Sequence, residues 1–425
     1  MVSAKADPKM PEPPQFPFHD EYLGGIDRVF SLFLAREDVR RFLSAVLTIR
    51  NAKIFLSGGY GSGKNTFVEI AAKTFFGDSL GVVRCHQELT TFDILWNINI
   101  TRTLEGKANA ITPRPLITAP FKYLNEVQRL NTQCQNALLN VLTDKIIAFS
   151  DVAAETPDYV CFLDRNPHDV GTIGMVKALL DRIDFFLDVE YLGMKHSIDL
   201  LATKFKEKQV EDLRFLAEPI LSPAQMLEIW RDVEKISITP KDLFKISLVS
   251  MLLRRCIKAD RSITSPRFRV ICEGCPYNGQ PCSRQERPVG QRWVDSVIKL
   301  AKACAWLEKR SVVDFKDILW GLPRTLPHRL DLKQNLFLKF SNETDWVVQD
   351  FMPMVHGKLS MWDEAMTLFE EGRKGDAEAL KKLNELAEKD LAVRELRDWA
   401  QSETRRMEKP PELLIKEELA PRGMA

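Results

Sequence analysis

The sequence predicts an α/β fold, in which helices wrap a parallel β-sheet, followed by a largely helical second half. From about residue 23 to 200, short apolar runs of strand length alternate with amphipathic helical stretches. From about residue 201 to 330 the strand signal is lost, and helical patterns such as SPAQMLEIWRDVEKI and RWVDSVIKLAKACAWLEKR dominate. These two observations favour a helix–sheet–helix sandwich with a helical region appended to it.

We expect four parts along the chain. Residues 1–22 are proline-rich, and we expect them to form a flexible arm. We expect residues 23–200 to form the core that contains the sheet. Residues 201–330 predict a helical domain, with a cysteine-containing insertion at 256–290. The last part, 331–425, is expected to be a helical appendix that ends in a loose tail. In this appendix Asp376 is the expected N-cap of a helix with Leu380, Leu383, Leu386 and Ala387 on one face.

The composition is that of an ordinary globular protein. The 425 residues carry a formal net charge of +1, with 45% hydrophobic and 28% charged side chains, so the overall balance indicates neither nucleic acid nor an acidic membrane as a partner. No apolar run approaches the roughly 18–20 residues of a membrane-spanning helix. The N-terminal stretch lacks the apolar core of a secretory signal. We therefore expect a cytoplasmic protein with no membrane contact.

The strongest single motif lies in IFLSGGYGSGKNTFVEIAAKTFF, residues 54–76. Gly58, Gly63 and Lys64 fit the pattern GxxxxGK between an apolar strand and an amphipathic helix, which is the context of a phosphate-binding loop. Backbone N–H groups and the helix N-terminus would surround phosphates, and the lysine would reach the outer ones. The expected nucleotide contacts are Gly58, Gly59, Tyr60, Gly61, Ser62, Gly63, Lys64, Asn65 and Thr66.

Two further strand-length runs, APFKYLNEV and PDYVCFLDRN, also end in polar residues. In parallel α/β sheets, ligands bind at the carboxyl ends of the strands. Asn125 and Glu126 stand where phosphoryl-transfer enzymes carry an acidic pair for Mg²⁺ and for the attacking water. Asn166 is a candidate for orienting that water, and Arg182, after a helical stretch in ALLDRIDFF, for a charge that reaches a neighbouring subunit. Taken singly, these residues are typical of turns and solvated surfaces.

Together these elements, in this order, resemble the MoxR/RavA branch of the AAA+ ATPases, which is related to the ATPase subunit of magnesium chelatase. The resemblance covers roughly residues 25–330 and depends on GGYGSGKNTF, PRPLITAPFKYLNEVQRLNTQCQNALLNVL and DRNPHDVGTIGMVKALLDRIDFF. It implies a P-loop AAA+ αβα sandwich, a helical lid, and a hexameric ring with ATP and Mg²⁺ between subunits. In it Glu126 aligns water, Asn166 is sensor one and Arg182 is an arginine finger acting in trans.

The resemblance also implies a sensor-two arginine in the lid. Arg292 in VGQRW opens a helix as the family's arginine does, and is favoured over Arg267 in TSPRF, which is followed by a cysteine loop.

The sequence departs from the family on the metal side of the site. Family members mostly have Thr or Ser at position 65 and Asp at position 125, and both are Asn here. An Asn oxygen can still approach Mg²⁺, which keeps several waters and takes much of its shell from phosphates. We therefore expect a working but slow ATPase.

The segment ICEGCPYNGQPC carries a second candidate site. Cys272, Cys275 and Cys282 have the spacing of thiolate metal ligands, with Cys256 as the expected fourth ligand and Cys304 as the fallback. The arrangement resembles the iron–sulfur staple of RecB-like nucleases, which implies a [4Fe–4S] cluster; structural Zn²⁺ fits the spacing as well.

Four functions remain open. The leading one is a MoxR-type ATPase that remodels, assembles or activates a partner complex, with a von Willebrand factor A protein as a separate chain. The others are a motor subunit of a metal chelatase, a nucleic-acid-dependent ATPase, which is not favoured, and a nucleotide-gated scaffold with little turnover.

Overall fold

The computed structural model describes residues 16–33, 35–98, 100–104, 111–149, 152–167, 175–189, 198, 217–254, 275 and 277–408. The chain divides into two compact units. Unit 1 comprises Met1–Ile238 and Asp295–His328, and unit 2 comprises Thr239–Val294 and Arg329–Ala425. The boundaries predicted at 22, 200 and 330 stay predictions.

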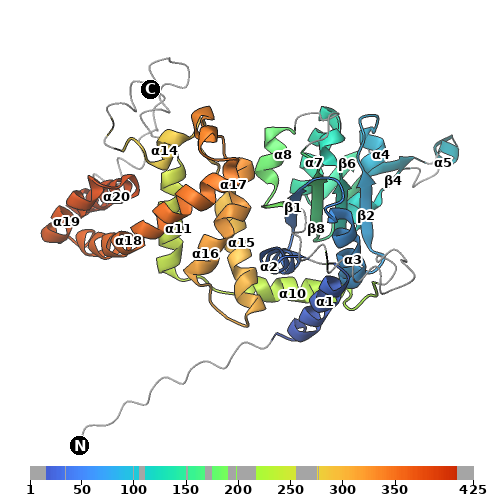
Figure 1. The fold of residues 1–425 in the computed structure, drawn as a ribbon, viewed down its shortest axis with the longest axis horizontal. Helices are drawn as coiled ribbons and strands as arrows, with labels where there is room; N and C mark the ends of the chain where they lie inside the picture. Colours follow the sequence, from blue (N-terminus) through green and yellow to red (C-terminus); the bar gives the residue numbers. More distant parts are fainter. Residues whose placement is uncertain are drawn as a thin grey trace, which may run out of the picture. The chain divides into compact units, whose positions relative to one another are not determined.

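Unit 1 is built on a five-stranded sheet in the order β2-β5-β8-β1-β9. Every neighbouring pair in it is parallel. All five strands therefore end at the same edge of the sheet, and Figure 1 labels β1, β2 and β8 among them. The strands are β1 (Ala52–Ser57), β2 (Leu80–Arg84), β5 (Phe121–Asn125), β8 (Val160–Arg165) and β9 (Phe185–Asp188).

Helices pack on both faces of this sheet because each central strand is buried on both sides. On one face Leu124 and Leu163 belong to a core cluster with Leu138 of α7 (Thr132–Thr143) and Leu179 of α8 (Lys177–Arg182). On the other face the rings of Phe121 and Phe162 contact aromatic residues of α3 (Lys64–Phe76). Unit 1 also contains α1 (His19–Leu32), α2 (Glu37–Leu47), α10 (Pro223–Lys235) and α16 (Phe315–Thr325).

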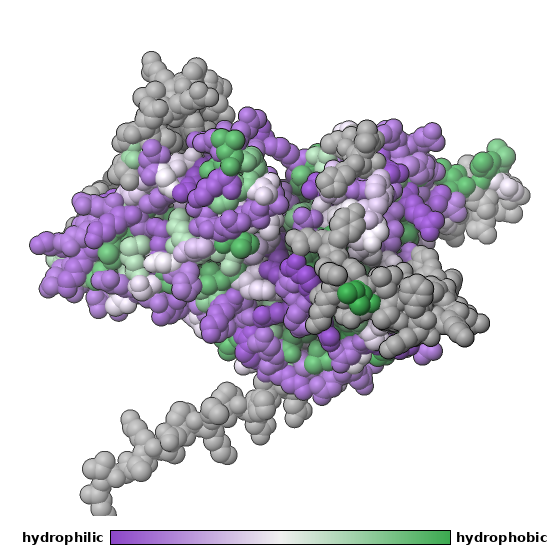
Figure 2. All heavy atoms as spheres, viewed as in Figure 1, coloured by the Kyte–Doolittle hydropathy of each residue, from purple (hydrophilic) through white to green (hydrophobic). Residues whose placement is uncertain are grey.

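Smaller elements extend from the sheet. The antiparallel pairs are β3 (Trp96–Ile98) with β4 (Ile111–Pro113), and β6 (Ile146–Phe149) with β7 (Val152–Glu155). Short helices α4 (Thr91–Leu95), α5 (Ile100–Leu104) and α6 (Pro115–Thr118) and the 3-10 turn η1 (Val127–Arg129) lie between the strands. Ile100 and Leu104 are 70% and 83% exposed, so α5 carries apolar side chains into solvent (Figure 2).

Unit 2 is helical in its described part. It contains α11 (Pro240–Leu253), α14 (Pro281–Arg284), α17 (Glu343–Trp346), α18 (Met352–Gly372), α19 (Ala377–Ala387) and α20 (Leu391–Glu408), with the short turns η4 (Gln334–Leu338) and η5 (Val347–Phe351). Helix α15 (Arg292–Leu307) begins in unit 2 and continues into unit 1, which ends in η3 (Pro327–Arg329). Asp376 caps α19, as predicted, by accepting from the backbone of Glu378 and Ala379.

The predicted fold class is therefore confirmed for the parallel sheet between helices and for the helical C-terminal region. The cysteine-containing insertion is not, because most of it lies outside the described residues. Within the described ranges, none of the helices is both long and apolar enough to cross a membrane.

A buried lysine on β5 stabilises the contact between the sheet and the end of α6. Lys122 of β5 is fully buried, and its Nζ donates to the carbonyl oxygens of Leu116 (2.6 Å), Ile117 (2.9 Å) and Ala119 (2.9 Å). Burial lowers the pKa of Lys122 to about 8. The three carbonyls lie at the end of α6, where a helix leaves acceptors without intrahelical partners.

We expect Lys122→Met to lower the free energy of unfolding by about 2 kcal/mol or more, because buried acceptors then lose their donor. Lys145→Met is the matched control: Lys145 is 63% exposed and pairs with Asp158 at 3.4 Å, so its loss should cost less than about 1 kcal/mol. Urea unfolding of both variants measures the difference. Equal midpoints for the two variants would contradict this role for Lys122.

Candidate nucleotide site

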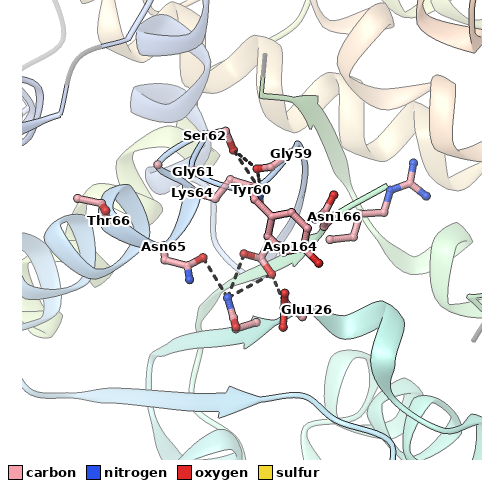
Figure 3. A pocket seen from close by; sticks show the side chains of 13 residues that line it. Gly59, Tyr60, Gly61, Ser62, Lys64, Asn65, Thr66, Glu126, Asp164 and Asn166 are labelled. Atoms are coloured by element: carbon pink, nitrogen blue, oxygen red, sulfur yellow. Dashed lines mark hydrogen bonds between the residues drawn. The ribbon is translucent and has the colours of Figure 1, made fainter. Parts of the chain in front are cut away.

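The predicted phosphate loop and strand ends meet in one pocket of about 300 Å³ at the carboxyl edge of the sheet (Figure 3). Its lining comes from three places in the chain: the loop after β1, the end of β5 and the end of β8. The lining residues are Gly59, Tyr60, Gly61, Ser62, Gly63, Lys64, Asn65, Thr66, Asn125, Glu126, Asp164, Arg165 and Asn166. The sequence had indicated all of these except Asp164 and Arg165.

The loop geometry requires glycine at several positions. Gly61 and Gly63 have φ angles of 74° and 81°, in the left-handed region that other residues rarely adopt. At Gly58, a Cβ would lie 2.5 Å from the carbonyl oxygen of Val189, so only glycine allows this backbone approach. Helix α3 begins directly after the loop, and its N-terminal N–H groups give the pocket positive potential.

Lys64 lies folded against the loop. Its Nζ donates to the carbonyl oxygens of Gly58 (2.6 Å) and Gly59 (3.0 Å) and to Ser62 Oγ (3.1 Å). Partial burial lowers the pKa of Lys64. The ammonium group is therefore held at the mouth of the loop, where phosphate oxygens can replace the carbonyls as acceptors.

Glu126 follows β5 in an unusual backbone conformation. Its φ angle is 57°, which is rare for a residue with a long side chain and is typical of functional sites. Its backbone N–H donates to Asp164 Oδ1 at 2.5 Å, and its carboxylate lies 3.3 Å from an Nη of Arg129. Glu126 is one of the residues that line the pocket.

The two asparagines that are expected on the metal side of the site, Asn65 and Asn125, are hydrogen-bonded to each other. Asn125 Nδ2 donates to Asn65 Oδ1 at 3.0 Å, and the Tyr123 hydroxyl lies 2.6 Å from the same oxygen. Asp164 of β8 completes the group, with Oδ2 at 2.8 Å from the Tyr123 hydroxyl and 3.2 Å from Asn125 Nδ2. Burial raises the pKa of Asp164, opposed by the hydrogen bonds that it accepts.

Asn166 and Arg165 follow Asp164 at the end of β8. Asn166 is 3% exposed and lines the pocket. Arg165, which sequence reasoning missed, donates from Nε to Ser57 Oγ at 3.3 Å and stacks over the Phe55 ring at 5.3 Å. The side chains from β1 and β8 therefore meet where the two strands pair.

The other predicted site residues lie outside this pocket or outside the described residues. Arg182 ends α8, where Nε donates to Thr143 Oγ1 at 2.9 Å and an Nη to the Ala178 carbonyl at 3.1 Å. Arg292 is the first residue of α15 and is exposed. Arg267 lies outside the described residues. The roles assigned to these arginines stay predictions.

Of the cysteine cluster, the structure describes Cys275 and Cys282, both half-buried thiols without a disulfide. Cys256 and Cys272 lie outside the described residues, and within the described part of the chain no group of three metal-ligating side chains is found. Cys304 is buried in α15, where burial raises the pKa of its thiol to about 12, so it behaves as an inert core residue.

The fold and the pocket agree with the comparisons. Residues 53–183 match the AAA domain of the dynein-related subfamily, so this part of the chain is an AAA domain. The domain supports ATPase activity.

The particular relatives extend the match over most of the chain. It is 23% identical to YeaC of Bacillus subtilis over 334 residues, 78% of this chain and 92% of YeaC. It is 23% identical to MoxR of Paracoccus denitrificans over 286 residues, 66% of this chain and 79% of MoxR.

A crystal structure of a predicted ATPase from Cytophaga hutchinsonii has the same fold, with a TM-score of 0.64 at 19% identity over 80% of this chain and 94% of that one. The predicted resemblance to MoxR-type AAA+ ATPases is confirmed.

Proposed function

We propose that this chain is a MoxR-like ATPase that binds ATP with Mg²⁺ in the pocket at the carboxyl edge of the sheet and hydrolyses it. The observation that carries the proposal is the convergence of the phosphate loop, Glu126 and Asn166 in one pocket. The matched AAA domain and the similarity to MoxR support the same assignment.

The pocket residues divide the chemistry between them. Backbone N–H groups of the loop and Lys64 hold the phosphates, and Glu126 orients the attacking water. Asn166 positions that water or contacts the outer phosphate. Bound Mg²⁺ would neutralise developing charge on the phosphate oxygens. The residues that line the pocket fit Mg²⁺, because Asn65, Asp164 and Glu126 offer amide and carboxylate oxygens as ligands.

Hydrolysis by this arrangement needs a second subunit. Arg182 lies outside the pocket residues of its own chain, and a neighbouring chain in a ring could present it to the nucleotide. We propose a hexameric ring, with Arg182 acting in trans and Arg292 as sensor two. Turnover is expected to be slow because Asn65 and Asn125 replace the usual metal-side residues.

The work of such a ring would be to remodel, assemble or activate a separate partner complex, with a von Willebrand factor A protein as the candidate partner. The similarity to MoxR favours a MoxR-type ATPase over the metal-chelatase motor. No observation favours nucleic acid.

We expect Glu126→Gln to keep ATP affinity within about threefold while lowering turnover at least about a hundredfold, because the amide cannot polarise water. Lys64→Ala should instead weaken ATP binding at least about tenfold by removing the phosphate cation. Fluorescent-nucleotide titration and phosphate release separate the two effects. Unchanged turnover in the Glu126 variant would make hydrolysis at this pocket untenable.

A mixing experiment tests the arginine finger. Glu126→Gln and Arg182→Ala should each be inactive alone, but a 1:1 mixture should recover roughly a quarter of wild-type turnover, since a quarter of randomly formed interfaces join an intact glutamate to an intact arginine. Arg231→Ala, an exposed arginine paired with Glu228, is the control and should match wild type. A mixture no more active than its components would exclude action in trans.

We also propose a metal at the cysteine cluster, held by Cys256, Cys272, Cys275 and Cys282. The described part of this loop is held in place next to Cys275, because the buried Tyr277 donates from its hydroxyl to the Ala387 carbonyl at 2.7 Å. Iron–sulfur and zinc both remain compatible with four thiolates.

Anaerobically purified protein should contain about four irons or about one zinc per chain by elemental analysis. Cys275→Ser should lose most of that metal, whereas Cys85→Ser, at a buried thiol in the AAA domain, should keep it. Absorption spectra identify an iron–sulfur cluster directly. Wild-type protein without stoichiometric metal would remove this site from the proposal.

A further inference from the structure

We infer that Asp164, on β8, supplies the metal-side carboxylate of the nucleotide pocket in place of Asn125, on β5. The acidic group would thus have moved to the neighbouring strand without leaving the site. This inference rests on the proposed function, because it concerns how the pocket holds the cation that accompanies ATP.

The pairing of the two strands places the residues side by side. Strands β5 and β8 are parallel neighbours in which Leu124 pairs with Leu163, so the next residues, Asn125 and Asp164, follow at the same level. Side chains alternate between the faces of a sheet. Asp164 shares its face with Phe162, whose ring contacts Phe67 of α3. That face is the one on which α3 begins, with Asn65 in its first turn.

The hydrogen bonds confirm that these side chains converge. Asn125 Nδ2 is surrounded by oxygen atoms: Tyr123 Oη at 2.9 Å, Asn65 Oδ1 at 3.0 Å, and Asp164 Oδ2 and Oδ1 at 3.2 and 3.5 Å. The Asn125 nitrogen is thus surrounded by amide, phenol and carboxylate oxygens. Hard divalent cations such as Mg²⁺ bind to oxygen ligands of this kind.

The group has more acceptors than protons to satisfy them. The Tyr123 hydroxyl has one proton, but it lies 2.6 Å from Asn65 Oδ1 and 2.8 Å from Asp164 Oδ2, and it can donate to only one of them. The remaining oxygen pair then faces lone pair to lone pair. This corner of the pocket is therefore short of positive charge.

Rotating either asparagine amide by 180° does not remove the excess of acceptors. Rotation of Asn65 would place its NH₂ group against the NH₂ group of Asn125. Rotation of Asn125 would place its oxygen against the carboxylate of Asp164. A cation that binds several oxygens at once resolves the conflict, as a proton on Asp164 would, and a Mg²⁺ titration distinguishes the two.

Asp164 also has a structural contact, which the test must separate from metal binding. Its Oδ1 accepts from the backbone N–H of Glu126 at 2.5 Å, and the residue is 1% exposed. Asp164→Asn keeps the shape and an oxygen for that N–H but removes the charge. A purely structural role would change stability and leave the Mg²⁺ dependence of nucleotide binding as it was.

The experiment measures binding of a fluorescent non-hydrolysable ATP analogue in EDTA and across a Mg²⁺ titration, with Mn²⁺ binding by electron paramagnetic resonance as a second readout. We expect Asp164→Asn to bind the analogue in EDTA as wild type does, but to need about tenfold more Mg²⁺ or more for half-saturation. The double variant Asn125→Asp/Asp164→Asn, which returns the carboxylate to β5, should restore half-saturation to within about threefold of wild type.

Asp158→Asn is the matched control. Asp158 precedes the opposite end of β8, is 16% exposed, and pairs with Arg50, so its variant should keep the wild-type Mg²⁺ dependence. If Asp164→Asn does not fold, the double variant decides: restored Mg²⁺ dependence supports the inference, and a tenfold loss in this folded protein overturns it.

Two failures are distinguishable. Wild-type protein that binds no analogue in either condition would refute the proposed function itself. Wild-type protein with a clear Mg²⁺ dependence that Asp164→Asn shares to within a factor of two would leave the nucleotide site standing and overturn only the assignment of Asp164.

Discussion

The parallel pairing of β1, β8 and β5 is the constraint on which the rest of the pocket depends. Ser57 pairs with Arg165, and Leu124 with Leu163, so the three strands end at one level. Whatever follows each strand must therefore meet at the same edge of the sheet. A shift of one residue in this register would turn Asp164 toward the opposite face and leave the phosphate loop without its acidic neighbours.

The pocket places opposite charges on opposite sides. Lys64 and the N-terminus of α3 provide positive potential on the loop side, whereas Glu126 and Asp164 provide acceptors at the strand ends. These parts are physically coupled, because the backbone N–H of Glu126 donates to Asp164 while its φ of 57° sets the direction of its side chain. The carboxylate that we assign to the metal side thus also supports the backbone of the residue that we assign to water.

Part of this site could be predicted from the sequence because its signals are local. GGYGSGK between a strand and a helix identifies the loop, and polar residues after apolar strands identify Glu126 and Asn166. Asp164 was missed because it lies within β8, whereas the sequence analysis considered the polar residues that follow the strands. The signal was present in the alternation of the strands, since Tyr123 and Asn125 lie on one face of β5, and Phe162 and Asp164 on one face of β8. Which faces coincide is decided by pairing.

The sequence by itself determined the α/β class of the core, the helical C-terminal region, the phosphate loop and the Asp376 cap, because each depends on neighbours within a few residues. Only the tertiary structure decided that Asn65, Asn125 and Asp164 form one group. Those contacts join strands and helices far apart in the chain. Their geometry follows from strand order, register and face, which are properties of the assembled sheet and not of any single segment.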